Sequence, residues 1–309
     1  MTANNPQVPW TDEQWARVNQ VVLEEAGRAR VGATFLPLVG PLSPDADFVR
    51  AEAIPTDAPL RIEDKITIQL ATLQIRVEVR GAQIADPEMR GVLALFRRAA
   101  NVLARLEDAV VFRGLVQADA GFRPGGGVDD LPQIWQVHGG QVTPGLWEQV
   151  PRNPSWQWIA LPATGQALVA AVSKAIGALE GHGHFGPFAV ALGDGLFLTA
   201  QTPDQDSLVL PQDRIIPFLS GGSLLRSSTL SDHNGYSGVI VALGGTPIEL
   251  VVATDVSPQF LQITDEPRYL FRVRERIALR IKEADAIVRL YSPDGAEERQ
   301  KARKNNPNR

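Results

Sequence analysis

The sequence predicts an α+β fold built around long strands and one long helix. Polar and apolar residues alternate from Lys65 to Arg80 and again from Tyr269 to Ile281, which is the period of a β-strand. Residues 86–112 instead repeat apolar side chains at helical spacing. The order of a helix, a long strand, this long helix, a mixed helix-and-strand insert and final strands is typical of α+β proteins.

Composition limits the classes of protein that the chain can represent. At 309 residues there is room for one large or two medium domains. The net charge of −5 gives no general attraction to nucleic acid or acidic lipid, and the absence of cysteine excludes disulfides and thiolate chemistry. We expect no membrane span and no secretory signal, because no apolar run is long enough and the N-terminus lacks the signal pattern.

The first expected element is a helix that begins after Thr11. Thr11 and Gln14 fit the two polar positions of a capping box. Trp10 and Trp15 fit the two apolar positions of a hydrophobic staple. The helix should lie on a surface and stop near Gly32, because its apolar stripe is narrow and consists of Trp15, Val18, Val22 and Ala26.

The alternation over residues 65–80 predicts a strand far longer than the usual length of about 5–6 residues. At about 3.3 Å per residue it would reach about 50 Å. A slip of the alternation at Ala71-Thr72 indicates a β-bulge. Because a long open strand edge aggregates unless another chain covers it, we interpret the segment as an arm that reaches a neighbouring subunit. Its apolar side chains are Ile66, Ile68, Leu70, Leu73, Ile75, Val77 and Val79.

The helix at 86–112 is expected to form the spine of a domain. Asp86 fits its N-cap, Pro87 its first position, and Gly114 lies just past its end. The Gly-, Pro- and Trp-rich residues 121–162 then predict loops and short strands at a domain boundary.

An insert and the final strands complete the expected elements. A helix over 165–179 with Thr164 as N-cap precedes a buried strand at 188–192. Gly244-Gly245 separates two apolar runs and predicts a β-hairpin. The other expectations are short helices at 196–201 and 213–219, strands at 239–243, 248–253, 269–281 and 286–290, and a disordered polar tail at 292–309.

No motif makes a convincing active site, so we expect a protein that is not an enzyme. Residues 181–186 spell G-x-G-x-x-G, but they follow a helix and precede a strand, the reverse of a dinucleotide-binding turn. Residues 125–127 are three glycines without the Lys-Ser/Thr of a phosphate-binding loop. Residues 234–238, which contain Ser237, lack the nucleophile elbow of hydrolases.

Two further groups of side chains are candidate sites. His182 and His184 are expected to be solvated loop residues rather than a metal site. The other two histidines, His138 and His233, are distant in sequence. Basic residues on one face of the last long strand allow three interpretations: a solvated sheet face, inter-subunit salt bridges or a polyanion site. They are Arg272, Arg274, Arg276, Arg280 and Lys282.

Four segments together resemble one family. They are residues 10–15 followed by Gly40-Pro41, residues 106–114 (LEDAVVFRG), residues 183–190 (GHFGPFAV) and residues 279–287 (LRIKEADAI). They are similar, in this order, to the N-terminal helix and its exit, the end of the spine helix, a helix-to-strand turn and the C-terminal strand pair of the encapsulins. Encapsulins are the shell proteins of bacterial and archaeal nanocompartments. The resemblance implies the major-capsid fold of tailed phages, of the Hong Kong 97 type.

The resemblance also implies how the chain is divided. The P-domain would carry the spine helix, the extended E-loop arm would pair between subunits, and the tips of the A-domains would meet around symmetry axes. The implied boundaries are 1–46 for the N-terminal helix and the start of the P-domain, 47–85 for the E-loop, 86–150 for the P-domain with the spine helix, 151–254 for the A-domain, 255–291 for the C-terminal P-domain strands and 292–309 for the tail.

Two binding sites follow from the same resemblance. Encapsulins hold cargo enzymes by a C-terminal peptide of the cargo, in an apolar groove whose matching residues here are Phe35, Leu36, Leu38, Val22 and Ala26. Ala33 and Pro37 stand where many members carry charged residues, so docking here would rest on apolar burial. A five-fold pore loop would place an acidic ring that attracts cations, unless it is an ordinary exposed turn; it contains Asp204, Gln205 and Asp206.

The expected function is that of a shell subunit of a closed icosahedral compartment in the cytoplasm. The resemblance implies sixty copies or an icosahedral multiple, pores for small solutes, and a cargo enzyme that is either a ferritin-like iron oxidase for iron storage or a dye-decolourising peroxidase. No cofactor, metal, membrane or nucleic-acid partner is expected; flavin-binding members carry a Trp near the end of the arm, and this chain has none there. The alternative is the major capsid protein of a phage or prophage that packages DNA. A hydrolase would need a nucleophile and a base that we do not find.

Overall fold

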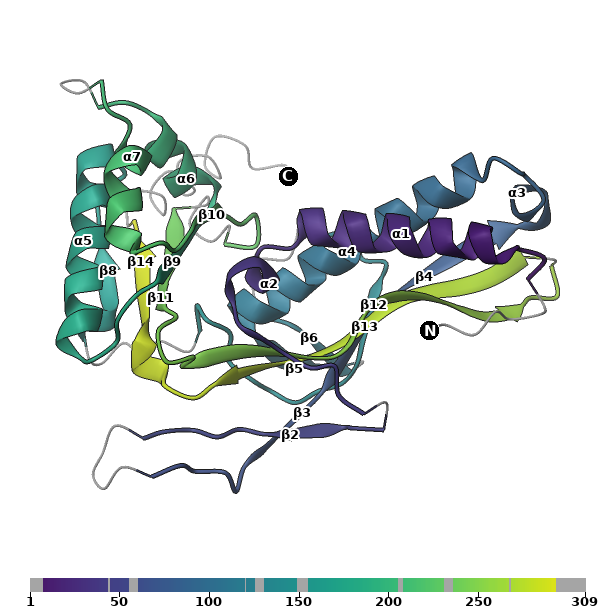
Figure 1. Cartoon of the computed structure of the whole chain (residues 1–309), viewed down its shortest axis with the longest axis horizontal. Helices are drawn as coiled ribbons and strands as arrows, with labels where there is room; N and C mark the ends of the chain where they lie inside the picture. The colour runs from purple at the N-terminus through teal and green to yellow at the C-terminus, as the bar shows by residue number, and fades with distance from the viewer. Residues whose placement is uncertain are drawn as a thin grey trace.

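The computed structural model describes residues 8–43, 45–55, 61–119, 121–125, 131–148, 155–204, 208–230, 236–266 and 268–292. Two five-stranded sheets organise the chain into two units (Figure 1). The strand order of the first sheet is β1 (Leu38–Val39), β12 (Ile248–Ile263), β13 (Arg268–Ile281), β4 (Ala71–Arg80) and β7 (Trp135–Gly139). The order of the second is β10 (Leu224–Arg226), β9 (Phe188–Leu192), β11 (Ser237–Ala242), β14 (Ile287–Tyr291) and β8 (Trp158–Ala160). The predicted α+β fold is confirmed.

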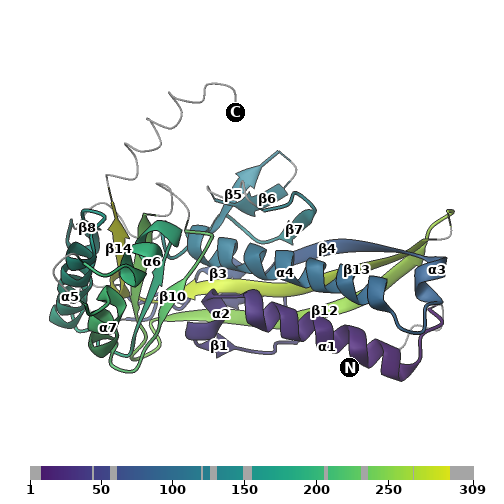
Figure 2. The same cartoon turned by 90° about the horizontal axis from the view of Figure 1, so that it is seen from above.

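Two long helices lie side by side against one face of the first sheet, as Figure 2 shows. They are α1 (Asp12–Ala29) and α4 (Arg90–Arg113). An aromatic cluster fills the space between the helices and the sheet. The ring of Phe271 on β13 lies 5.1 Å from that of Trp10 and 5.4 Å from those of Phe96 and Phe260. This cluster is the centre of the larger of the hydrophobic cores.

The start of α1 is as predicted. The Gln14 N–H donates to Thr11 Oγ1 at 3.2 Å, and the Thr11 N–H donates to Gln14 Oε1 at 3.0 Å. The rings of Trp10 and Trp15 meet edge to face at 5.0 Å. The capping box and the hydrophobic staple are therefore confirmed. The helix ends at Ala29, and Gly32 opens a short helix, α2 (Gly32–Phe35), instead of ending α1.

The spine helix is present as α4, but its predicted first turn is wrong. Asp86 Oδ1 accepts the N–H of Glu88, and the Met89 N–H donates to the Asp86 carbonyl, so these residues form a turn. Met89 takes a left-handed conformation with φ 54°, and the helix begins at Arg90. Gly114 follows the helix as predicted, with φ +69°. A Cβ there would lie 2.0 Å from the Thr143 carbonyl oxygen, so only glycine fits.

The interpretation of 65–80 as one free arm is wrong for its second half. The segment breaks at Leu70 into β3 (Thr67–Gln69), which pairs with β2 (Phe48–Arg50), and β4. β4 lies inside the first sheet between β13 and β7. Four apolar side chains of the supposed arm are buried in this chain's own core, at 0–5% exposure: Leu73, Ile75, Val77 and Val79. Alternation identifies a strand and its buried face, but it does not say which chain covers that face.

The second sheet has helices and a core of its own. α5 (Gly165–Gly181), α6 (Asp194–Gln201), α7 (Pro211–Ile215) and the 3₁₀ turn η2 (Ile216–Leu219) pack against it. The Ala167 N–H donates to Thr164 Oγ1, so the predicted cap of α5 is confirmed. β9 is buried along its whole length, as expected. A second cluster of buried residues lies between α5 and the strands.

The predicted hairpin across Gly244-Gly245 is wrong. β11 pairs with β9 and β14 in the second sheet, whereas β12 pairs with β1 and β13 in the first. The glycines therefore lie where the chain crosses between the sheets. The chain crosses again between β13 and β14, through the 3₁₀ turn η4 (Ala284–Ala286). β14 thus joins the second sheet, and β12 begins in the first, which shifts the boundaries implied for residues 151–254 and 255–291.

The remaining elements are short. They are α3 (Gly81–Ile84), the two-stranded β5 (Leu115–Ala118) and β6 (Gly121–Pro124), and the 3₁₀ turn η1 (Ser155–Gln157). Among the described residues, no helix combines the length and the apolar character needed to cross a membrane. The tail from residue 293 lies outside the described residues.

Candidate assembly and docking surfaces

The β2–β3 segment extends away from the first sheet and has exposed apolar side chains (Figure 1). Beyond the paired strands, Ala53 and Glu63 form an isolated antiparallel bridge that continues the ribbon. The exposed side chains are Phe48, Ile62 and Ile66, at 56%, 66% and 59%. We call the described residues 47–55 and 61–69 the projecting ribbon. It is the described segment that best fits the predicted arm.

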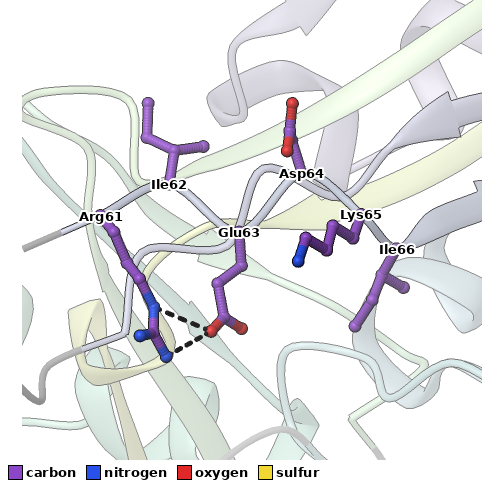
Figure 3. A pocket seen from close by; sticks show the side chains of 6 residues that line it. All are labelled: Arg61, Ile62, Glu63, Asp64, Lys65 and Ile66. Atoms are coloured by element: carbon purple, nitrogen blue, oxygen red, sulfur yellow. Dashed lines mark hydrogen bonds and ion pairs between the residues drawn. The ribbon is translucent and has the colours of Figure 1, made fainter.

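The projecting ribbon is fixed to its own subunit at its base. Arg276 forms an ion pair with Asp47 at 2.7 Å, and Arg280 forms one with Glu52 at 3.3 Å. Further out, residues 61–66 line a hollow of about 460 Å³ (Figure 3). Figure 3 shows the Arg61 guanidinium paired with the Glu63 carboxylate, at 2.8 Å. Ion pairs at the base and the exposed side chains of Ile62 and Ile66 further out suit a contact with another chain.

Three of the five predicted groove residues do not line a surface. Val22 and Ala26 lie on the inner face of α1 and are fully buried, and Leu36 is 3% exposed. Val22 and Ala26 belong to the stripe that packs α1 onto the core, and one helix face cannot pack inward and also receive a peptide. Leu36, just after α2, belongs to the same core. This part of the groove prediction is wrong.

Phe35 and Leu38 do reach the surface. Phe35 is half-buried, with its ring 6.3 Å from that of Phe112, and Leu38 is 54% exposed on the edge strand β1. The carboxylate of Asp108 fixes this region by accepting N–H bonds from Val31 and Gly32 at 2.9 and 2.7 Å. Sequence reasoning missed Leu23, which is 46% exposed on α1. Leu23 directly follows Val22, a residue of the buried apolar stripe, and this position could have indicated that Leu23 faces outward.

Of the predicted pore residues, Asp204 is described and Gln205 and Asp206 lie outside the described residues. Asp204 is half-buried and 3.9 Å from the guanidinium of Arg214. It also packs at the start of α5, where a Cβ on Gly165 would lie 2.7 Å from its carboxylate. The charge of Asp204 is therefore partly compensated within the subunit, and the acidic ring stays a prediction.

Several of the basic residues on one face of β13 form ion pairs within the chain. Arg280 and Lys282 both bind Glu249, and hydrogen bonds from these two residues outweigh the effect of burial and lower the pKa of Glu249. Arg272 donates to the side chains of Gln259 and Gln74 instead. Burial lowers the pKa values of Arg272 and Arg274, and the charge of a neighbouring arginine adds to this effect. This face of β13 is partly satisfied inside the subunit and is not a fully solvated surface.

The structure agrees with the expectations for Ser237 and His182 but not with that for His184. Ser237 is fully buried and its hydroxyl donates to the Leu230 carbonyl at 2.6 Å, which agrees with its dismissal as a nucleophile. His182 is exposed, as predicted, and stacks on Trp156 at 3.9 Å. His184 is buried at 7% exposure, so the expectation of a solvated loop residue is wrong for it. His138 is exposed on β7, and His233 lies outside the described residues.

A buried acidic cluster joins the helices to the first sheet. Glu107 of α4 and Glu275 of β13 are each 1% exposed, and Arg30 lies 3.7 Å from Glu107. Burial raises the pKa of Glu107 to about 7 despite the opposing effect of Arg30. Burial and the charge of Glu107 together raise the pKa of Glu275 well above its usual value.

This cluster predicts a pH dependence of stability. Because the folded state holds a proton on Glu107 that the unfolded state releases, the free energy of unfolding should fall as pH rises from about 4.5 to about 7. Glu107→Gln should remove that part of the slope and stabilise the protein above about pH 7. Thermal unfolding of both proteins across this pH range measures the difference. Parallel curves for the two proteins would contradict the burial effect.

Comparisons with known proteins agree with this geometry. Residues 138–278 match the family described as "Encapsulating protein for peroxidase". The "Type 1 encapsulin shell protein EncA" of Myxococcus xanthus is 27% identical, over 94% of this chain and 96% of that protein. A virus-like particle from Pyrococcus furiosus has a TM-score of 0.66 at 16% identity, over 90% of this chain and 99% of the other. The SrpI encapsulin of Synechococcus elongatus PCC 7942 has a TM-score of 0.54 at 13% identity, over 94% and 92%.

The fold is that of the shell proteins of tailed phages and related particles. The phage XM1 capsid matches at a TM-score of 0.50 and 13% identity, over 83% of this chain and 89% of the other. Within this class, the family match and the Myxococcus relative assign the chain more narrowly. The chain is therefore similar to encapsulin shell proteins, through the family match at residues 138–278 and through the Myxococcus relative along nearly its whole length.

Proposed function

We propose that many copies of this chain assemble into a closed icosahedral shell, of sixty subunits or an icosahedral multiple, in the cytoplasm. The shell encloses a cargo enzyme and acts by confinement, not by catalysis in the shell itself. The projecting ribbon carries this proposal, because its apolar side chains are exposed in the single subunit while its base is held by ion pairs. Contacts repeated from subunit to subunit build closed shells when their rotations close.

Electron microscopy of the purified protein tests assembly directly. We expect hollow, uniform particles and, by mass spectrometry, a co-purifying enzyme. The family description supports a peroxidase, with a ferritin-like iron oxidase as the second candidate. A preparation that sediments only as single chains of 33.5 kDa would contradict the proposal. Particles filled with DNA would instead support the phage-capsid alternative, for which the net charge of −5 gives no favourable lining.

We propose that a cargo peptide docks on apolar side chains around Phe35 and Leu38. Leu38 contributes because it is 54% exposed on an edge strand, whose free backbone groups can pair with an extended peptide. We also propose that small solutes enter the shell through a pore near Asp204 and its neighbours.

Leu38→Asp should lower the cargo content of the shells about tenfold, because it places a charge where apolar burial is needed. Assembly should persist, since surface substitutions change stability by only about 0.5 kcal/mol. Leu38→Met is the matched control and should keep its cargo. Quantitative mass spectrometry of intact particles measures the ratio of cargo to shell. Equal cargo in all three proteins would exclude this docking surface.

A further inference from the structure

The turn between α5 and β9 lies where the chain crosses between the two sheets. The crossing between β11 and β12, residues 243–247, contacts this turn, because the Gly244 N–H donates to the Phe185 carbonyl at 3.3 Å. This crossing also binds the crossing between β13 and β14, because the Lys282 N–H donates to the Pro247 carbonyl at 2.8 Å. Side chains at this junction can therefore link the two units of the subunit.

Three potential metal ligands converge at this junction. His184 comes from the turn, and Glu283 and Asp285 come from the crossing between β13 and β14. His184 Nε2 lies 3.0 Å from Asp285 Oδ1, and Nδ1 lies 4.0 Å from Glu283 Oε2. One ligand atom from each residue can be chosen so that all three lie within 4.8 Å of one another. The side chain of His184 is 8% exposed, and those of Glu283 and Asp285 are 30% and 22% exposed.

Two of these atoms are buried without a hydrogen bond to the described residues. They are His184 Nε2 and Asp285 Oδ1, which face each other without hydrogen-bond geometry. Buried polar atoms are nearly always satisfied, because an unsatisfied one costs about 1–3 kcal/mol. A shared cation can satisfy two such lone-pair donors, because the ion need not lie on the line that joins them.

We propose that His184, Glu283 and Asp285 bind a divalent transition-metal ion. Two bonds of about 2.1 Å at a right angle put their donor atoms about 3.0 Å apart, which fits the measured spacing of His184 Nε2 and Asp285 Oδ1. One imidazole with two carboxylates suits Zn²⁺, Mn²⁺ or Fe²⁺ better than Ca²⁺ or Mg²⁺, which prefer oxygen alone. Glu283, the most exposed of the three, moves to close the site, and water completes the coordination.

The bound ion crosslinks the two units of the subunit. His184 moves with α5 and the second sheet, whereas Glu283 follows directly after β13 of the first sheet. Binding therefore stabilises one orientation of the second unit relative to the first. Since an ion that binds only the folded state adds to its stability, the protein should melt at a higher temperature with Zn²⁺ present.

Equilibrium dialysis with Zn²⁺ tests the site on the full-length protein after treatment with a chelator, at about pH 7.5, where unperturbed imidazole is neutral. The test variants are His184→Phe and Asp285→Asn. His182→Gln is the matched control, because it removes an exposed histidine two residues away. Wild type and control should bind one ion per chain, and both test variants should bind about tenfold more weakly or worse. Zn²⁺ should raise the melting temperature of the wild type and the control alone.

Three results would overturn the site. They are failure of the wild type to bind Zn²⁺, undiminished binding by the test variants, or an equal loss in His182→Gln. The first result would indicate that these side chains meet without holding a metal ion. Asp285→Asn keeps the shape of the side chain, so it tests the site even if His184→Phe fails to fold. Sedimentation of the same samples reports assembly separately, so the site and the shell can fail independently.

Discussion

Shortening the projecting ribbon should abolish shells and leave a folded subunit. Ala53 and Glu63 are antiparallel bridge partners, so an Asn-Gly turn can join them in place of residues 54–62. The change removes the exposed Ile62 and the hollow beside it, but it removes none of the residues of either sheet. We expect single chains or small oligomers in sedimentation, with unchanged circular dichroism, and no particles in electron micrographs.

Asp64→Asn is the control for this variant. Asp64 lies in the same ribbon, and the substitution removes its ion pair with Arg50. The side chains of Asp64 and Arg50 are 50% and 69% exposed. Exposed pairs contribute about 0–1 kcal/mol, so its shells should form normally. Intact particles from the shortened chain would contradict the role given to the ribbon. Deleting residues 66–79 instead would remove β4, so that larger deletion should unfold the subunit and cannot test assembly.

Phe271→Ala should cost about 3–5 kcal/mol of subunit stability. The ring is fully buried and touches aromatic neighbours from α4, from β12 and from the segment before α1. Alanine would leave a cavity at the point where helices and sheet meet. Denaturant unfolding of the shortened-ribbon protein measures the loss without interference from shell assembly.

Leu261→Ala on the neighbouring strand is the control for the cavity. Leu261 is 37% exposed, so its loss should cost less than about 1 kcal/mol. Similar values for the two variants would show that the aromatic cluster is not the centre of the core.

Local patterns predicted the elements well. The capping box of Thr11, the cap at Thr164 and the glycine after the spine helix each depend on neighbouring residues, and all three are confirmed. The alternation at 71–80 also identified its buried face correctly. What it could not supply was the partner strand, because Ala71 pairs with Ile277 about 200 residues later.

The sites were less predictable for the same reason. Val22 and Ala26 share their side of α1 with the core, which became clear only once α4 was placed against it. Gly244-Gly245 has the local signature of a hairpin, yet strand pairing takes the two runs into different sheets. His184 meets Glu283 and Asp285 from about 100 residues away, and no local pattern records that meeting.

The distant pairing of β4 sets an order for biogenesis. On the ribosome, β4 emerges long before β13, so the edge of β4 that pairs with β13 stays open until β13 has been made. The second sheet is incomplete for as long, because its strand β14 follows β13. The first sheet, which carries the projecting ribbon, is therefore complete only after nearly the whole chain has been made. Under the assembly proposed above, half-made polypeptides are kept from joining a growing particle, and that dependence acts as a quality check that needs no separate factor.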